Sequence, residues 1–289
     1  MMEFKKVSPA DRVWMQKAVS DAGRFSCEFS FGNLFSWGNS AGITAAEVCG
    51  TLICKMGNGY SLPMGQNRDE AFERLMALPK KAPWQLFGVS ESDFDWLSRK
   101  IGAFTPRYER AWSDYIYSTD SLAGLKGKKL AAKRNHINAF LREHPVWHTE
   151  DITPQNMPAV RAFRRRWIEQ NAAHGDESFR YELQMSEMML EHFFEIGLQG
   201  LVLYAGEDIV AFSFGEPISP DCYCVHVEKA LAQVRGAYPL INREFVRRYC
   251  GGYGYVNRED DSGEPGLRQA KLSYEPAMIL HKYEITMEK

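Results

Sequence analysis

The sequence lacks an export signal, a membrane span and a metal-binding cysteine pattern. Its N-terminus carries no apolar segment of the signal-peptide kind, and no stretch approaches the roughly 18 uncharged apolar residues of a transmembrane helix. Its six cysteines form no CxxC pair, so we expect reduced thiols that pack as small hydrophobic residues. These absences predict a cytoplasmic protein with no integral membrane association and no bound metal.

The sequence also lacks an excess of charge. The 35 Lys and Arg residues nearly balance 37 Asp and Glu residues, giving a formal net charge of −2 that offers no general case for binding nucleic acid or anionic membranes. With 289 residues, 45% hydrophobic and 25% charged, the composition is that of an ordinary globular protein. This length is close to that at which single cores divide, so one or two domains are expected.

Hydrophobic periodicity, caps and turn residues predict intermixed helices and strands. In the first half we expect helices at 8–19, 67–78 and 91–100, and strands around 47–55, 59–64, 84–89 and 107–117. In the second half we expect helices at 126–143, 155–171, 178–197 and 239–250, and strands at 201–205, 209–215, 222–230, 253–257 and 277–285. This order predicts an α+β fold with a mixed sheet.

A glycine turn at 233–238 leads from one of these strands into the helix expected at Pro239. Such a turn presents backbone N–H groups and the positive end of a helix dipole to an anion, of which a cofactor diphosphate is the usual example. Alternatively, Gly236 serves only to make the turn. Pro239 has no backbone N–H, so the site has one donor fewer.

Alternation along the strand 222–228 places Cys222, Cys224, His226 and Glu228 on one face. These four residues cannot chelate one ion together, because the first and last lie roughly 20 Å apart along a strand. We interpret the cysteines as packed thiols. His226 and Glu228 are candidates for proton transfer, although His226 also fits as a satisfied structural residue.

An acidic cluster, 258–261, follows the strand expected at 253–257. Its carboxylates, Asp260 among them, could deprotonate an amine or bind a cation, or they could form ion pairs in a solvated loop. Nearby, Arg268 and Lys271 offer positive charge, and Tyr274 offers a phenolic acid.

The charge balance fails between 121 and 142, where basic residues occur without any acidic residue. Three- and four-residue steps predict that several of them share one helix face. This face would suit a phosphate-bearing partner such as RNA, a nucleotide or a lipid head group; a solvated basic helix is the alternative. The residues of this candidate patch are Lys126, Lys129, Lys133, Arg134 and His136.

These motifs give the chain a resemblance to the bacterial family related to the C-terminal catalytic region of phosphatidylglycerol lysyltransferase. The resemblance rests on SFGNLFSW (30–37), KGKKLAAKRNHINAF (126–140), HVEKA (226–230) with RGAYPLIN (235–242), and VNREDDSGEPGLRQAKLSY (256–274). It implies two tandem GNAT-like lobes (GNAT denotes the acyl-CoA N-acyltransferase fold), one at 1–120 without a donor site and one at 121–289 with the candidate donor site. Each lobe would have a central mixed, mainly antiparallel sheet flanked by helices.

The resemblance also implies a function. An acyl or aminoacyl group would pass from acyl-CoA or aminoacyl-tRNA to an amine or hydroxyl of a small-molecule or peptide acceptor. The implied donor loop comprises Gln233, Arg235, Gly236, Ala237 and Tyr238, where Tyr238 departs from the small residue usual at that position.

Under the same resemblance, Glu228, or Asp260 through water, would act as the base, and Tyr274 would protonate the leaving group. Arg268 and Lys271 would hold the phosphates of the donor or the acceptor end of tRNA. The alternative is a catalytically inactive GNAT-like module that binds RNA, a nucleotide or a protein partner.

Overall fold

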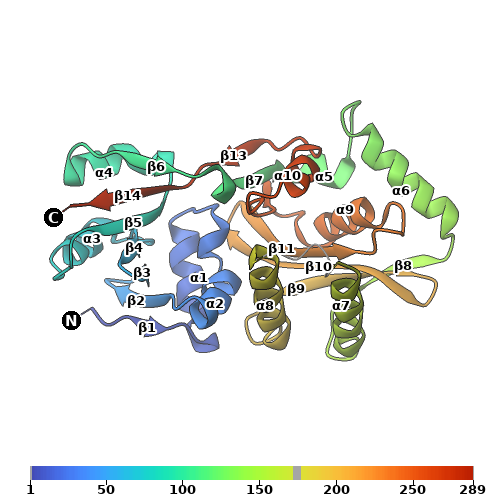
Figure 1. The fold of residues 1–289 in the computed structure, drawn as a ribbon, viewed down its shortest axis with the longest axis horizontal. Coiled ribbons are helices and arrows are strands. Elements are labelled where there is room, and N and C mark those ends of the chain that lie inside the picture. The colour runs from blue at the N-terminus through green and yellow to red at the C-terminus, as the bar shows by residue number, and fades with distance from the viewer. Residues whose placement is uncertain (1, 172–176, 289) are drawn as a thin grey trace.

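Two seven-stranded sheets form the framework of the protein in a computed structural model that describes residues 2–171 and 177–288 (Figure 1). The first sheet has the order β1 (Lys5–Lys6), β2 (Thr44–Val48), β3 (Thr51–Met56), β4 (Gly59–Ser61), β5 (Trp84–Val89), β14 (Tyr283–Met287), β6 (Pro106–Tyr108). The second has the order β13 (Met278–Leu280), β7 (Asp114–Ser118), β12 (Tyr255–Asn257), β11 (Cys222–Ala230), β10 (Asp208–Ser219), β9 (Gln199–Ala205), β8 (Trp147–Asp151).

The two sheets repeat one plan. In each, the first four strands pair antiparallel and the fourth pairs parallel with the fifth, which are β4 with β5 and β11 with β12. A parallel pair needs a crossover connection, and a helix supplies it both times. These helices are α3 (Arg68–Met76) and α9 (Ala237–Tyr249). The α+β class and the two similar lobes with mixed, mainly antiparallel sheets are confirmed.

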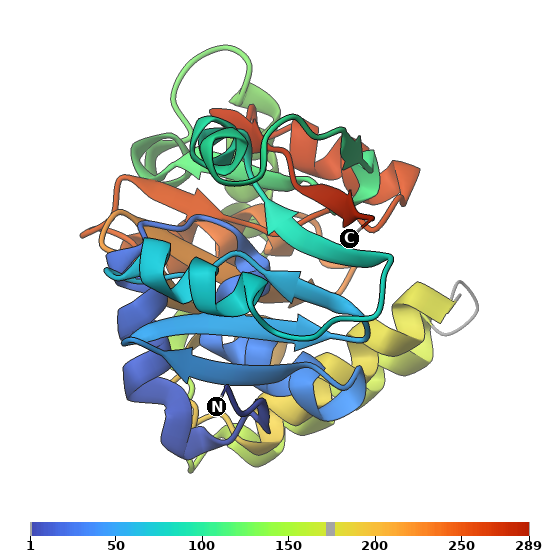
Figure 2. The same ribbon diagram turned by 90° about the vertical axis from the view of Figure 1, so that its left-hand side faces the viewer.

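The repeats exchange their last strands. After β6 the chain crosses to the second sheet, where β7 lies between β12 and β13. After β13 it crosses back, and β14 lies between β5 and β6. Figure 1 shows the red β14 among the blue and green elements, and Figure 2 shows it beside the strands of the first sheet. The segment at 277–285 is therefore not one strand, as the sequence predicts, but two strands in different sheets.

The cores lie on both sides of each sheet. One core joins both lobes and contains residues of α1 (Arg12–Asp21), α2 (Phe31–Ser40), α7 (Met157–Asn171) and α8 (Glu177–Glu191) with the facing strands β3 and β10. The opposite face of the second sheet packs against α9, α5 (Thr119–Gly124) and α6 (Ala131–Glu143). That of the first sheet packs against α3 and α4 (Phe94–Ile101).

Several helices differ from the sequence-based expectation: α2 and α5 were not expected, and α8 ends at Glu191 rather than at 197. Helix α6 begins at Ala131 rather than at 126, because a turn with Gly127 at φ +86° precedes it. Helix α9 begins at Ala237, so Pro239 lies within its first turn, where no N–H is needed. Helix α10 (Pro265–Leu272), also starting at a proline, was not expected. Among the described helices, none is long and apolar enough to cross a membrane.

Candidate functional site

Strand β11 contains a bulge that sets the geometry of the site. Phe214 of β10 pairs with Val227, but the next residue, Gly215, pairs with Val225, so His226 is the extra residue. A side chain at Gly215 would meet the backbone oxygen of Cys224 at 1.9 Å, which explains why glycine stands there. A bulge interrupts the alternation of side chains. His226 and Glu228 therefore face opposite sides of the sheet, and the expectation that they share a face is wrong.

His226 is a buried link between two carboxylates. Its Nε2 lies 3.0 Å from Oε1 of Glu216, and its Nδ1 lies 2.8 Å from Oε1 of Glu259. The imidazole is only 1% exposed and Glu216 is fully buried. Glu216 also accepts hydrogen bonds from the Gly32 N–H at the start of α2 and from the amide of Gln16 in α1. The chain of contacts thus joins the second sheet to the helices of the first lobe.

The neighbours of His226 determine its charge. Burial opposes protonation, but the Cys224 sulfur and hydrogen bonds to Glu216 and Glu259 outweigh it and raise the pKa of His226 well above its usual range. Burial also raises the pKa of the Cys224 thiol to about 12, so this thiol is neutral at neutral pH. The hydrogen bonds to Glu216 and Glu259 therefore stabilise a protonated His226.

Glu259 borders a pocket of about 650 Å³ between the lobes. Its Oε1 accepts the hydrogen bond from Asn33 of α2 at 3.0 Å as well as that from His226. Within residues 2–171 and 177–288, its Oε2 accepts none, and the side chain is 27% exposed. Glu259 also has a left-handed backbone, φ 59°, which is uncommon for a side chain of this size. An acidic group with one oxygen fixed and the other accessible can receive a proton from a bound molecule.

Cys224, His226 and Glu259 are also the residues of the described chain best placed to hold a metal, with ligand atoms within 4.8 Å of one another. However, His226 Nδ1 and Glu259 Oε1 are 2.8 Å apart, a hydrogen-bond distance. Two ligands on a tetrahedral zinc with bonds of about 2.0–2.2 Å would stand roughly 3.3 Å apart. The set is satisfied by its own hydrogen bonds, and the absence of a metal stays a prediction.

The opposite face of β11 carries a second cluster. Glu228 accepts hydrogen bonds from Arg258 at 2.9 Å and from Asn242 of α9 at 2.8 Å. The Arg258 guanidinium lies 4.6 Å from the centre of the Tyr274 ring. Burial raises the pKa of Tyr274, so the phenol keeps its proton at neutral pH. Two buried polar atoms in this cluster, Arg258 Nη1 and Asn242 Oδ1, have no partner among the described residues.

The two clusters lie on the two faces of the sheet at the point where β11 and β12 separate. Pairing between these strands ends at Cys224 and Asn257. Beyond that point, His226 reaches Glu259 on the pocket side, and Glu228 reaches Arg258 on the α9 side. The gap between the fourth and fifth strands is thus lined by titratable groups on both of its faces.

The glycine turn packs tightly. Gly236 is the N-cap of α9 with φ +86°, and a side chain there would meet the backbone oxygen of His136 in α6 at 2.1 Å. The close approach of α6 therefore explains the glycine without a ligand. Gln233 and Arg235 are exposed beside it, Ala237 is buried, and Tyr238 is half-buried.

Arg268 and Lys271, which the resemblance assigns to donor phosphates, instead bind groups of the acidic loop 258–261. Lys271 is buried and donates to the backbone oxygens of Arg258, at 2.6 Å, and of Asp260. Arg268 forms a two-bond ion pair with Asp261. Burial raises the pKa of Asp260, which also borders the pocket. These contacts explain the loop shape that presents Glu259.

The basic patch does not form one helix face. Lys126 and Lys129 precede α6, and Lys129 pairs with Glu275 at 2.7 Å. Lys133 bonds Ser273 at 2.7 Å and lies 4.0 Å from the centre of the Tyr274 ring. Arg134 turns back to the backbone oxygens of Leu125 and Gly127. Of the patch, only Lys126, Lys129 and His136 are exposed.

Sequence reasoning missed residues that the strand exchange brings together. Lys282, between β13 and β14, forms a buried ion pair of 2.9 Å with Asp114 at the start of β7. Asn257 of β12 and the Cys27 N–H also bind Asp114. Asn33 and Glu216, which position Glu259 and His226, were missed as well. Asn33 and Glu259 lie in two separate motifs on which the family resemblance rests, SFGNLFSW and VNREDD. Membership in these motifs is the sequence signal that could have found them.

The comparisons with known proteins agree with this architecture. The model of the family described as phosphatidylglycerol lysyltransferase, C-terminal, matches residues 20–286. A conserved protein of unknown function from Bacteroides thetaiotaomicron has a crystal structure with a TM-score of 0.93 and 36% identity, covering 99% of this chain and 100% of its own.

The C-terminal domain of a putative lysylphosphatidylglycerol synthetase from Agrobacterium fabrum has a TM-score of 0.61 and 13% identity, over 96% of this chain and 92% of that one, and so shares the fold. An uncharacterized protein of Mycoplasmoides gallisepticum is 24% identical over 172 residues, 59% of this chain. The match spans only 55% of that relative's length.

Proposed function

This chain belongs to the family of the phosphatidylglycerol lysyltransferase C-terminal region, and on that premise we propose that it transfers an acyl or aminoacyl group to an amine in the inter-lobe pocket. The observation that carries this proposal is Glu259, which has one oxygen fixed by His226 and Asn33 and the other free at the pocket. It lies where β11 and β12 separate, so a donor and an acceptor on opposite sides of the sheet would meet there.

Glu259 acts as the general base in this proposal. The nitrogen of the acceptor attacks the carbonyl carbon of the donor, and its proton passes to Glu259 Oε2. The new C–N bond forms as the bond to the thiol of coenzyme A or to the ribose oxygen of tRNA breaks. His226, protonated between two carboxylates, is not a base at neutral pH; it orients Glu259 and adds positive charge near the developing oxyanion.

The donor approaches from the α9 side. Arg258 Nη1 and Asn242 Oδ1 are buried and without partners among the described residues, so a bound group would satisfy them. Tyr274 keeps its proton and would protonate the leaving group. The exposed side chains of Gln233 and Arg235, with those of Lys126, Lys129 and His136, offer polar and positively charged groups that the phosphates of acyl-CoA or tRNA would bind.

The charge of the pocket favours an amine. The protonated His226 and Lys282, which is already paired with Asp114 and Glu28, border it against five carboxylates. These carboxylates are Glu28, Glu182, Glu259, Asp260 and Glu284. Burial raises the pKa of both Glu28 and Asp260, and a positively charged amine beside them would stabilise their ionised forms. The phosphate of a lipid would be repelled by the ionised carboxylates. Apolar side chains of α2 and α8, Trp37, Leu34, Met185 and Met189 among them, form the walls.

The test is a transfer assay with the full chain. Bacterial aminoacyl-tRNA, acetyl-CoA and longer acyl-CoAs are each offered with a panel of hydrophobic amines, and N-acylated products are measured by mass spectrometry. We expect product from one donor class, and a loss of about 10²–10⁴-fold in rate for Glu259→Gln, which removes the base. Glu169→Gln, an exposed carboxylate on α7, is the matched control and should keep full activity.

The outcomes separate the alternatives. If the wild-type protein gives no product from any donor yet binds RNA, the non-catalytic binding module replaces the transferase. If the protein turns over but Glu259→Gln is fully active, the transferase stands and the base is wrong. Products from phosphatidylglycerol vesicles alone would overturn the assignment of an amine acceptor.

A further inference from the structure

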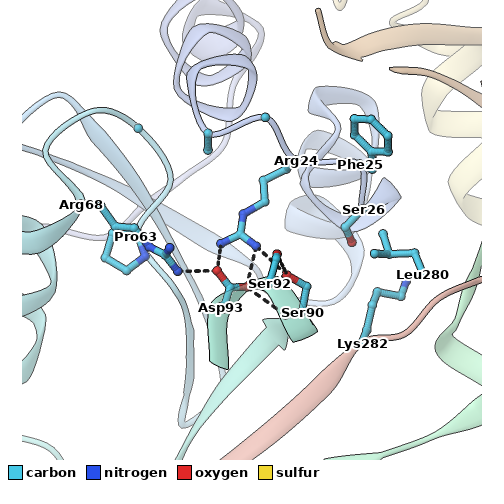
Figure 3. A pocket seen from close by; sticks show the side chains of 14 residues that line it. Arg24, Phe25, Ser26, Pro63, Arg68, Ser90, Ser92, Asp93, Leu280 and Lys282 are labelled. Atoms are coloured by element: carbon cyan, nitrogen blue, oxygen red, sulfur yellow. Dashed lines mark hydrogen bonds and ion pairs between the residues drawn. The ribbon is translucent and has the colours of Figure 1, made fainter. Parts of the chain in front are cut away.

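A second pocket, of about 450 Å³, lies in the first lobe (Figure 3). It is lined at the turn that leads from β4 into α3, at the end of β5 and at the segment 22–26. Turn 62–67 occupies the place in the first repeat that turn 231–236 occupies in the second, between the fourth strand and its crossover helix. In the second repeat α6 packs onto this turn at Gly236, whereas turn 62–67 borders the pocket at Pro63 and Gly65.

The pocket is rich in cations. Arg24, Arg68 and Lys282 line it together with a single carboxylate, Asp93. Arg24 binds both oxygens of Asp93, at 2.6 and 2.9 Å, and Arg68 also reaches Asp93 at 2.5 Å (Figure 3). Two guanidinium groups thus share one carboxylate, which leaves a net positive charge, whereas Lys282 is already paired with Asp114 and Glu28. Burial lowers the pKa of Arg68 despite Asp93, as expected where positive charge is incompletely compensated.

Two polar atoms of the lining have no partner. Arg68 Nε and Ser26 Oγ are buried, and neither forms a hydrogen bond with any residue that the structure describes. Ser26 is 6% exposed, so its hydroxyl is removed from solvent. An unpaired buried donor costs about 1–3 kcal/mol, and native proteins keep few of them. Both atoms belong to residues that line this pocket, and the two residues come from separate elements of the first lobe.

We propose that this pocket binds an oxyanion, a phosphate or carboxylate group carried by a small molecule. Guanidinium N–H groups, a serine hydroxyl and the N-terminus of α3 are the donors that such a group prefers. Ser90 and Ser92 add hydroxyls at the end of β5, and Phe25 and Leu280 provide apolar surface for the remainder of the ligand. The pocket adjoins the inter-lobe pocket, since Gly88 and Lys282 line both.

Thermal unfolding and calorimetric titration test the proposal, with inorganic phosphate, glycerol 3-phosphate and succinate as probes in chloride solutions of equal ionic strength. We expect one of these probes to raise the melting temperature and to bind the wild-type chain. The phosphate and carboxylate arms distinguish the two sources of the oxyanion. Arg68→Gln should weaken binding at least about tenfold through the loss of a charge-assisted bond. Arg99→Gln, an exposed arginine of α4 in the same lobe, should bind as the wild type does.

Ser26→Ala keeps the test decisive if Arg68→Gln unfolds. Because the Ser26 hydroxyl has no partner, its removal should leave the ligand-free melting temperature unchanged or raised, while binding falls about tenfold. A purely structural serine would show the reverse. The proposal is overturned if no probe binds better than chloride, or if Ser26→Ala and Arg68→Gln both bind with full affinity. Glu259→Gln should retain binding, which separates this pocket from the proposed transferase site.

Discussion

The two turns that enter α3 and α9 occupy the same position in two copies of one fold, yet they differ in what covers them. Turn 231–236 is sealed by the backbone of α6, which approaches Gly236 too closely for any side chain. Turn 62–67 borders an open, arginine-bearing pocket. The difference shows that a shared topology positions a site without deciding whether it is open, because α5 and α6, the connection between the repeats, have no counterpart in the first repeat.

The largest expected loss of stability follows from removing the Lys282–Asp114 ion pair, which joins the two repeats. Lys282→Met removes the ammonium that pairs with Asp114 where the strands cross between sheets. A buried carboxylate would then be uncompensated, and we expect a loss of about 3–5 kcal/mol in unfolding free energy, measured by urea denaturation. Lys81→Met, at an exposed lysine, should cost almost nothing. If Lys282→Met is equally harmless, the crossing does not depend on this pair.

The next largest expected loss of stability is at Gly236, in the turn that α6 covers. Gly236→Ala should destabilise by about 2–4 kcal/mol, because a side chain both strains the left-handed backbone and overlaps α6. Gly127→Ala is matched closely: its φ is also +86° but its surroundings are open, so it should lose only the backbone part, about 1–2 kcal/mol. Equal losses in denaturation experiments would mean that α6 yields readily and that the turn is not truly sealed.

The smallest expected loss of stability is at Asp93, beside the open turn, and this loss depends on pH. Burial alone would raise the pKa of Asp93, but hydrogen bonds and charge from Arg24, with Arg68, lower it to about 2. A carboxyl with a lowered folded-state pKa stabilises above its unfolded value, near 3.8, and that contribution of about 2 kcal/mol disappears as the pH falls toward 2.

Asp93→Asn should therefore lose about 2 kcal/mol at pH 7 and show a weaker loss of stability between about pH 4 and pH 2 than the wild type. Denaturant midpoints measured across that range check it. Some acid sensitivity should remain, because Arg268 and Tyr115 also hold the pKa of Asp261 at about 2 against its burial. An acid profile identical to that of the wild type would show that the arginines do not bind Asp93 as the structure has them.

Local elements were largely predictable from the sequence. The hairpin of β9 and β10, strand β11 and helix α7 follow from period and turn residues within a few positions. The bulge at His226 was not predictable, because it depends on how Gly215 of the neighbouring strand pairs. The basic segment was read as one helix from its spacing, whereas Gly127 ends that continuity.

The candidate site divides in the same way. The sequence proposed His226, Glu228 and the acidic loop as candidates, since each lies at a strand end within a distinctive motif. It could not show how Glu259 is held, because Asn33 and Glu216, which fix the network, come from distant segments. The roles assigned to Glu228, Tyr274 and the donor loop stay predictions.

The sequence by itself determined the class of the protein, since alternation, helical period and long motifs are properties of neighbouring residues. Its near-zero net charge was equally informative, because it gave no general case for binding nucleic acid or anionic membranes. Only the tertiary structure decided where charge is left over. Burial and the exchange of strands bring Lys282 to Asp114 and two arginines to one aspartate, and in a desolvated site such pairings, not totals, set the electrostatics.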